Sequence, residues 1–184
     1  LTFYLFPTTA NAGEDQTGAA TCGHTQVTLA ANTPTVGTGQ WSIQSGTGGS
    51  FGNATSPTTT FSGTAGVTYV LRWTISNAPC TASFDEMTVT FHQNPTVTCP
   101  GNITVNFSDP AFALTGGSPS GGTYSGPGVS GGMFNPSTAG GGTHTITYSY
   151  TNAAGCSGSC TFTITVNTAV SCPANSTVCI SDPA

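Results

Sequence analysis

The sequence of 184 residues has very little charge: it contains no lysine, one arginine (Arg72) and six acidic residues, so 4% of its side chains are charged. Globular domains typically carry about 25%. The near absence of positive charge excludes a basic surface for nucleic acid. The N-terminal LTFYLF is apolar but far too short to cross a bilayer, and it has no basic residues before it. We therefore expect neither nucleic-acid binding nor membrane insertion.

The sequence also lacks the motifs of known catalytic sites. Its three histidines, His24, His92 and His144, are scattered, and no HExxH, GxSxG or Ser/Lys motif is found. The glycines at 140–142 are not followed by GK[ST], which excludes a phosphate-binding loop of that type. A catalytic nucleophile needs an adjacent base and an orienting group. We predict no catalytic and no cofactor-binding residues, and conclude that the chain is not an enzyme.

The residues that are abundant favour short β-strands. Threonine, serine and glycine number 36, 19 and 25, a composition that disfavours long helices and suits strands joined by tight turns. The stretch YVLRWTIS (69–76) alternates apolar and polar positions, as a strand buried on one face does. Similar strands are expected around 26–29, 37–45 and 87–91. No helical period of useful length appears.

A tandem repeat organises the chain. VTCPGNITVNFSDPA (97–111) returns as VSCPANSTVCISDPA (170–184), with ten of fifteen positions identical at an offset of 73 residues. A fixed period indicates repeated structural units. Residues 97–169 are then one complete module, and residues 170–184 are the start of a further one.

The residues before position 97 form a second complete module on the same plan. TYVLRWTISN (68–77) overlies THTITYSYTN (143–152), and Met87, Val89 and Phe91 overlie Phe162, Ile164 and Val166. About seven short strands per module predict an all-β fold of two tandem immunoglobulin-like β-sandwich modules. The expected boundaries are 1–6 for the end of a preceding module, 7–92 for the first complete module, 93–96 for a linker, 97–169 for the second, and 170–184. The flanking strands would belong to neighbouring modules.

Several stretches resemble modules of large secreted surface proteins of the Bacteroidota. ANAGEDQ (10–16), VTLAANTPTVGTGQWSI (27–43) and the stretch up to Cys80 resemble PKD-like modules, and the second module, with CPGNITV (99–105) and CTFTITV (160–166), is similar to hyalin-repeat and Ig-like modules. The resemblance implies a structural or adhesive role, as in gliding adhesins and surface filaments. It also implies export by type IX secretion.

Seven cysteines in so small a chain indicate disulfides and an oxidising, extracellular compartment. The repeat defines four cysteine positions per module. The first module has only Cys22 and Cys80, which we predict to be partners. In the second module the corresponding logic predicts Cys99–Cys160 and leaves Cys156 free. Cys172 and Cys179 would be free or pair with another module.

Metal and glycan sites are weakly indicated. Cys156 and Cys160, with His144 or Cys172, could form part of a zinc site, but their positions in the repeat favour strand-end cysteines over ligands. The pairs Glu14-Asp15 and Asp85-Glu86, with Asp109 and Asp182 near the repeat boundary, are candidate Ca²⁺ ligands, and solvated carboxylates are the favoured interpretation. Trp41 and Tyr124, at corresponding positions, would either stack on sugars or, as we prefer, fill the sandwich core.

We expect a structural or adhesive shaft segment of a long extracellular cell-surface repeat protein or filament. Its partners would be neighbouring modules of the same chain or copies of itself, with surface glycans as a further option. Two alternatives stay open. One is that the chain is a carbohydrate-binding accessory region of a secreted polysaccharide-degrading enzyme. The other is that it is a fibre subunit that assembles by strand addition through residues 1–6 and 170–184.

Overall fold

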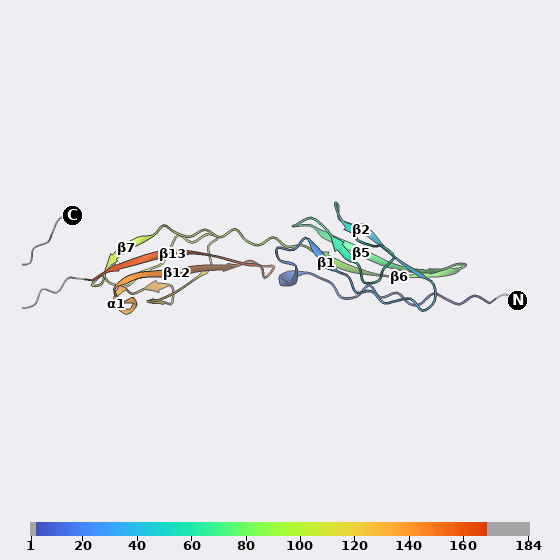
Figure 1. Ribbon diagram of the computed structural model, residues 1–184, viewed down its shortest axis with the longest axis horizontal. Helices are drawn as coiled ribbons and strands as arrows, with labels where there is room; N and C mark the ends of the chain where they lie inside the picture. Colours follow the sequence, from blue (N-terminus) through green and yellow to red (C-terminus); the bar gives the residue numbers. More distant parts are fainter. Residues whose placement is uncertain (1–2, 169–184) are drawn as a thin grey trace, which may run out of the picture. The chain divides into compact units, whose positions relative to one another are not determined.

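The computed structural model describes residues 3–168 and divides the chain into two compact units (Figure 1). The first unit is Leu1–Pro95 together with Thr151–Ser157, and the second is Thr96–Tyr150 with the chain from Gly158 onward. The division falls inside the expected linker, 93–96. The turn Thr151–Ser157, which the sequence analysis placed in the second module, belongs to the first unit. The expectations for residues 170–184, including Cys172, Cys179 and Asp182, lie outside the described residues.

The first unit consists of two three-stranded sheets. One has the strand order β1-β4-β3 and the other β2-β5-β6, with all neighbours antiparallel. Gln16 adds a parallel bridge to Val89 on the outer side of β6. The elements are η1 (Gly18–Thr21), β1 (Gln26–Thr28), β2 (Thr38–Ser45), β3 (Ser50–Phe51), β4 (Thr60–Ser62), β5 (Thr68–Asn77) and β6 (Cys80–Thr90).

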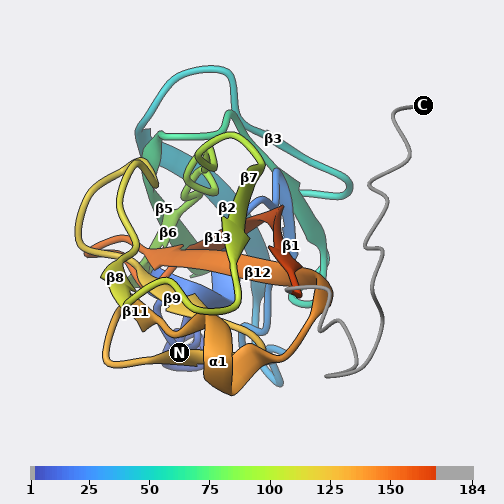
Figure 2. The same ribbon diagram turned by 90° about the vertical axis from the view of Figure 1, so that its left-hand side faces the viewer.

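The second unit repeats this arrangement. Its sheets have the orders β10-β11-β8 and β7-β13-β12-β9, and β7 pairs with β13 in parallel (Figure 2). The elements are β7 (Ile103–Asn106), β8 (Phe112–Ala113), β9 (Thr123–Ser125), β10 (Val129–Ser130), β11 (Met133–Phe134), α1 (Pro136–Ala139), β12 (Gly142–Thr151) and β13 (Ser157–Asn167). Within residues 3–168 the helices are too short to cross a membrane.

Both units have the connectivity of an immunoglobulin-like β-sandwich. In chain order, the strands of the first unit correspond to B, C, D, E, F and G, which gives one sheet of B, E and D and another of C, F and G. The strands β8 to β13 of the second unit correspond to the same six in the same order. The parallel partner of the last strand is Gln16 in one unit and β7 in the other. The predicted fold class is confirmed.

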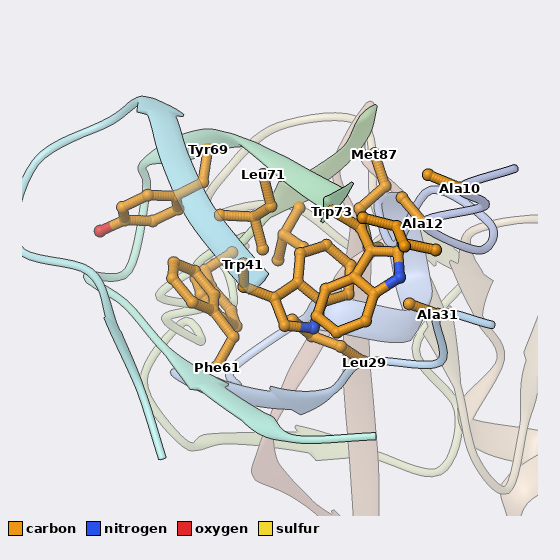
Figure 3. Packing of buried hydrophobic residues seen from close by; sticks show 13 residues of the cluster. Ala10, Ala12, Leu29, Ala31, Trp41, Phe61, Tyr69, Leu71, Trp73 and Met87 are labelled. Atoms are coloured by element: carbon orange, nitrogen blue, oxygen red, sulfur yellow. The ribbon is translucent and has the colours of Figure 1, made fainter. Parts of the chain in front are cut away.

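The core of the first unit is rich in aromatic side chains (Figure 3). Trp41 and Trp73 are directly opposite each other on β2 and β5, with their ring centroids 5.2 Å apart. Phe61 of β4 packs from the other sheet, and Tyr69 turns its hydroxyl away from the cluster, where it donates to the carbonyl of Thr47. Alternation along β5 buries every second residue, so burial of this face drives the packing of the two sheets.

The second unit uses the same positions with smaller or more polar aromatics. Tyr124 and Tyr148 are opposite each other on β9 and β12, 4.7 Å apart, where the first unit has Trp41 and Trp73. The Tyr148 hydroxyl accepts from the backbone N–H of Gly122. The rest of the core consists of buried Phe134, Ile146, Phe162, Ile164 and Val166.

A glycine stands two residues before Trp41 and two before Tyr124, and it makes room for the aromatic ring on the neighbouring strand. A Cβ at Gly39 would lie 2.0 Å from Cζ2 of Trp73, and a Cβ at Gly122 would lie 2.5 Å from Cζ of Tyr148. Real Cβ atoms do not approach other atoms so closely. The Gly-x-aromatic sequence is therefore a packing requirement shared by both units.

Candidate cross-link site

The chemically distinctive group of the first unit is a disulfide between distant parts of the chain. Cys22 and Cys156 are bonded at an S–S distance of 2.00 Å and are 134 residues apart in sequence. Cys22 directly follows η1, and Cys156 lies on the turn Thr151–Ser157, between β12 and β13. Cys156 is 1% exposed and Cys22 is half-buried, so the bond is largely shielded from solvent. The bridge ties the turn of the β12–β13 hairpin covalently to the first unit.

Local structure brings the two cysteines together. The turn is folded by Asn152, whose side-chain oxygen accepts from the backbone N–H groups of Ala154 and Cys156. Gly155 adopts a positive φ of 84°, and a Cβ there would meet Cβ of Ala19 in η1 at 3.3 Å. A side chain at Gly155 would thus strain the backbone and crowd η1. The turn and η1 fit together because a glycine stands at the point of contact.

The strand end beside Cys22 fixes the other half of the site. Cys22 bridges to His92 in parallel, and the Gly23 N–H donates to the His92 carbonyl at 2.8 Å. The buried Thr21 hydroxyl donates to the carbonyl of Thr90, the last residue of β6. Cys22 is therefore held at the C-terminal end of β6. We call η1, Cys22 and His92 the socket.

The predicted Cys22–Cys80 bridge is wrong. Cys80 opens β6, whereas Cys22 lies beside His92, just past the other end of that strand. At about 3.3 Å per residue the two cysteines are roughly 40 Å apart, while the Cα atoms of the observed Cys22–Cys156 pair are 5.4 Å apart. Cys156, expected to be free, is bonded, and Cys80 has no disulfide partner within residues 3–168.

A second disulfide joins Cys99 and Cys160, with an S–S distance of 2.06 Å and a sequence separation of 61. This is the pair that the repeat positions predicted. Cys99 lies four residues before β7, and Cys160 lies within β13. The bridge thus fastens the first strand of the second unit to its last strand. With both cysteines bonded and Cys156 bonded to Cys22, none of these thiols is left as a zinc ligand.

Four of the acidic residues are engaged in structural contacts. Asp85 accepts from the Ala12 N–H and Asp15 from the Thr88 N–H, while Glu86 pairs with Arg72 at 2.6 Å. Asp109 accepts from the N–H of Asn106. No group of three or more potential metal-ligating side chains occurs among the residues that the structure describes. Asp15 has a neutral counterpart, because Asn102 accepts from the Thr163 N–H at the equivalent place in the second unit.

The side chains offered as sugar platforms do not form an exposed row. Trp41 is buried in the core, and Tyr124 is half-buried against Tyr148. A hollow of about 540 Å³ does occur in the first unit. Its lining consists of hydroxyl, amide, glycine and proline residues: Thr33, Pro34, Gly37, Thr38, Gly39, Gln40, Thr55, Pro57, Thr74 and Ser76. Such a lining offers hydrogen bonds and no titratable group.

Sequence reasoning missed the Cys22–Cys156 bridge because the two cysteines are 134 residues apart in the chain. The overlay of 68–77 on 143–152 places Cys80 and Cys156 at corresponding positions, and the structure pairs Cys22 with His92 as it pairs Asn106 with Asn167. The error was to assume that partners lie within one module. One signal was present: the turn before Cys156, NAAGC, has one more residue than NAPC before Cys80, and that residue is the contact glycine.

No protein-family model matches the sequence, and no curated protein matches it significantly. Solved structures with a similar arrangement include Sidekick-1 immunoglobulin domains 1–4 (TM-score 0.46, 13% identity, covering 88% of this chain and 48% of that one). They also include the insect immune protein hemolin (0.41, 13%, 89% and 47%) and a Ca²⁺-stabilised adhesin of an Antarctic bacterium (0.39, 13%, 88% and 49%). The chain spans about half the length of these proteins. At such scores and identities, the likenesses carry no conclusion about ligands or partners.

Proposed function

We propose that the chain is a shaft segment of an extracellular cell-surface repeat protein and that it transmits tension. Its role is to extend and hold a distal binding part under tension. The observation that carries the proposal is the Cys22–Cys156 disulfide. Tension applied to the two ends would pass through this covalent bond, so the residues between the two cysteines would not bear it. Adhesion would be the task of the whole protein, to which this segment supplies reach and strength.

The two disulfides overlap in sequence, and this determines where tension would run. A pull on both ends follows the chain to Cys22, crosses to Cys156, and continues through Cys160. Everything between Cys22 and Cys156 is bypassed, including the aromatic core of the first unit and strands β7 to β12. Hydrogen bonds and core packing in this part then hold shape without carrying the load.

The surface chemistry suits exposure outside the cell. Two buried or half-buried disulfides require an oxidising compartment to form and persist. Solubility rests on threonine and serine hydroxyls, since charged side chains make up only 4% of the sequence. Export by type IX secretion, which the resemblance to Bacteroidota surface proteins implies, is a separate prediction. A type IX sorting domain elsewhere in the full reading frame would support it.

Single-molecule pulling from the two ends tests the proposal. With disulfides intact, the stretch bounded by the bridge, a separation of 134 residues, stays unextended. Reduction should therefore lengthen the fully stretched chain by about 450 Å, at about 3.3–3.6 Å per residue. In the Cys156→Ser variant the Cys99–Cys160 bridge still bypasses 61 residues, so without reductant the chain should lengthen by 134 − 61 = 73 residues, or about 250 Å. The matched Cys80→Ser variant should behave as the parent. Equal extension of the oxidised and reduced parent chains would contradict a covalent bypass.

A further inference from the structure

Cys80 occupies, in the turn between β5 and β6, the position that Cys156 occupies in the turn between β12 and β13. Each follows the long strand F and opens or precedes strand G, in the turns Asn77–Cys80 and Asn152–Cys156. The threonine pairs Thr68–Thr90 and Thr143–Thr165, hydrogen-bonded between hydroxyls at the same spacing, fix this equivalence. Cys156 is bonded and buried, whereas Cys80 is half-exposed and unbonded among the residues described. The cysteine of this turn is therefore bonded after β12, whereas after β5 it has no disulfide partner among the residues described.

Residues 3–7 match the chain that forms the strand-end side of the socket. Thr2-Phe3-Tyr4-Leu5-Phe6-Pro7 has the spacing of Thr90-Phe91-His92-Gln93-Asn94-Pro95, with threonine, phenylalanine and proline identical. Tyr4 then stands where His92 stands, and His92 is the residue that bridges to Cys22. A module whose last strand ran into these residues would place its own equivalent of Cys22 beside Tyr4.

The turn that bears Cys80 already lies against this segment. The Asn77 side-chain amide donates to the carbonyl of Leu5 at 2.8 Å. Leu5 is the residue after Tyr4, so the Cys80 turn sits next to the place where that further cysteine would be held. The Cys156 turn likewise lies beside Cys22, through Gly155 and Ala19.

The exposure of residues 3–6 supports the same occupant. Phe3 is 84% exposed, although its counterpart Phe91 is fully buried in the core of the first unit. Leu5 and Phe6 are 69% and 76% exposed. Exposed apolar side chains of this kind mark a contact surface, and the match of Phe3 to the buried Phe91 favours another module as the partner.

We infer that Cys80 forms a disulfide with a cysteine at the Cys22 position of a preceding module of the same type. The inference rests on the proposed role as a repeat segment and extends it: the array would be joined by disulfides from turn to socket as well as by its backbone. Two thiols lose two protons and two electrons to form the bond. A small disulfide such as oxidised glutathione accepts them and leaves as two thiols.

A tandem chain tests the inference. Residues 7–90, carrying Cys80→Ser, are placed ahead of residues 3–184, so that the added β6 runs into Phe3 as the natural β6 runs into Phe91. After refolding with reduced and oxidised glutathione, peptide mapping should find the added Cys22 bonded to the natural Cys80. Alkylation of Cys80 by iodoacetamide under native conditions should be lost, whereas Cys80 of the chain without the added module should be alkylated readily.

The matched control carries Cys22→Ser in the added module, and in it Cys80 should regain its reactivity. The inference would be overturned by a folded tandem in which iodoacetamide still alkylates Cys80. It would also be overturned if Cys80 were bonded to Cys172 or Cys179, or joined two chains into a dimer. If the added module fails to fold, mapping of the natural protein decides: Cys80 must be joined to an upstream cysteine, and a free Cys80 overturns the inference. These failures would leave the force bypass through Cys22–Cys156 untouched, because pulling tests it separately.

Discussion

Ala12 donates its backbone N–H to the carboxylate of Asp85 at 2.8 Å, and these two residues occupy the places that Cys99 and Cys160 occupy in the second unit. Asp85 lies four residues before Val89, and Cys160 four before its counterpart Ile164; Ala12 and Cys99 stand likewise before Gln16 and Ile103. One fold thus fastens its first strand to its last by a hydrogen bond in one unit and by a disulfide in the other.

This equivalence predicts a new disulfide. The double variant Ala12→Cys/Asp85→Cys should form a bridge during oxidative refolding, because the equivalent pair in the second unit has disulfide geometry. Closing a loop of 73 residues stabilises the native state by up to about 4 kcal/mol in the chain-entropy model. Thermal unfolding with and without reductant measures the gain. The single variant Ala12→Cys is the control, and a double variant that keeps two reactive thiols after refolding would show that the two units differ at this point.

Gly39 provides a second prediction, on packing. Gly39→Ala places a methyl group against the buried ring of Trp73, and overpacking of this kind typically costs about 1–3 kcal/mol. Gly101→Ala is the matched control, since a Cβ there has nothing within 4 Å, and its effect should stay within about 1 kcal/mol. Urea unfolding midpoints compare the two. Equal midpoints for both variants would mean that the Trp73 ring can move aside.

Salt and reductant should affect stability very differently. Within residues 3–168 the ion pair is Arg72–Glu86, with side chains 33% and 40% exposed, and exposed pairs contribute about 0.2–1 kcal/mol. Raising sodium chloride from about 0.01 M to 1 M, which shortens the Debye length from about 30 to 3 Å, should therefore change the unfolding free energy by less than about 1 kcal/mol. Each disulfide is worth about 4–5 kcal/mol by loop length. A midpoint sensitive to salt but indifferent to reductant would refute this.

The fold was predictable because its signals are local. The alternation in β5 and the glycine before each aromatic lie within a few residues, and the internal repeat allowed one unit to be checked against the other. The repeat also predicted the Cys99–Cys160 pair, since both cysteines belong to one sandwich.

The Cys22–Cys156 bridge was not predictable in the same way. Cys22 and Cys156 belong to different copies of the repeat, and an alignment of copies says which positions correspond but not which positions of different copies meet. Only the packing of Gly155 against Ala19 and the place of Cys22 beside His92 decide that. The roles of the acidic residues were hidden for a related reason, because Asp15 and Asp85 each accept a hydrogen bond from a backbone N–H group 73 residues away.

The most direct test of the covalent bypass is peptide mapping of the oxidised chain, cleaved without reduction after free thiols have been alkylated. The account predicts a Cys22 peptide joined to a Cys156 peptide, a Cys99 peptide joined to a Cys160 peptide, and an alkylated Cys80. A Cys22 peptide joined to Cys80, with Cys156 alkylated, would contradict it, because tension would then run through β6, between Cys80 and Cys99.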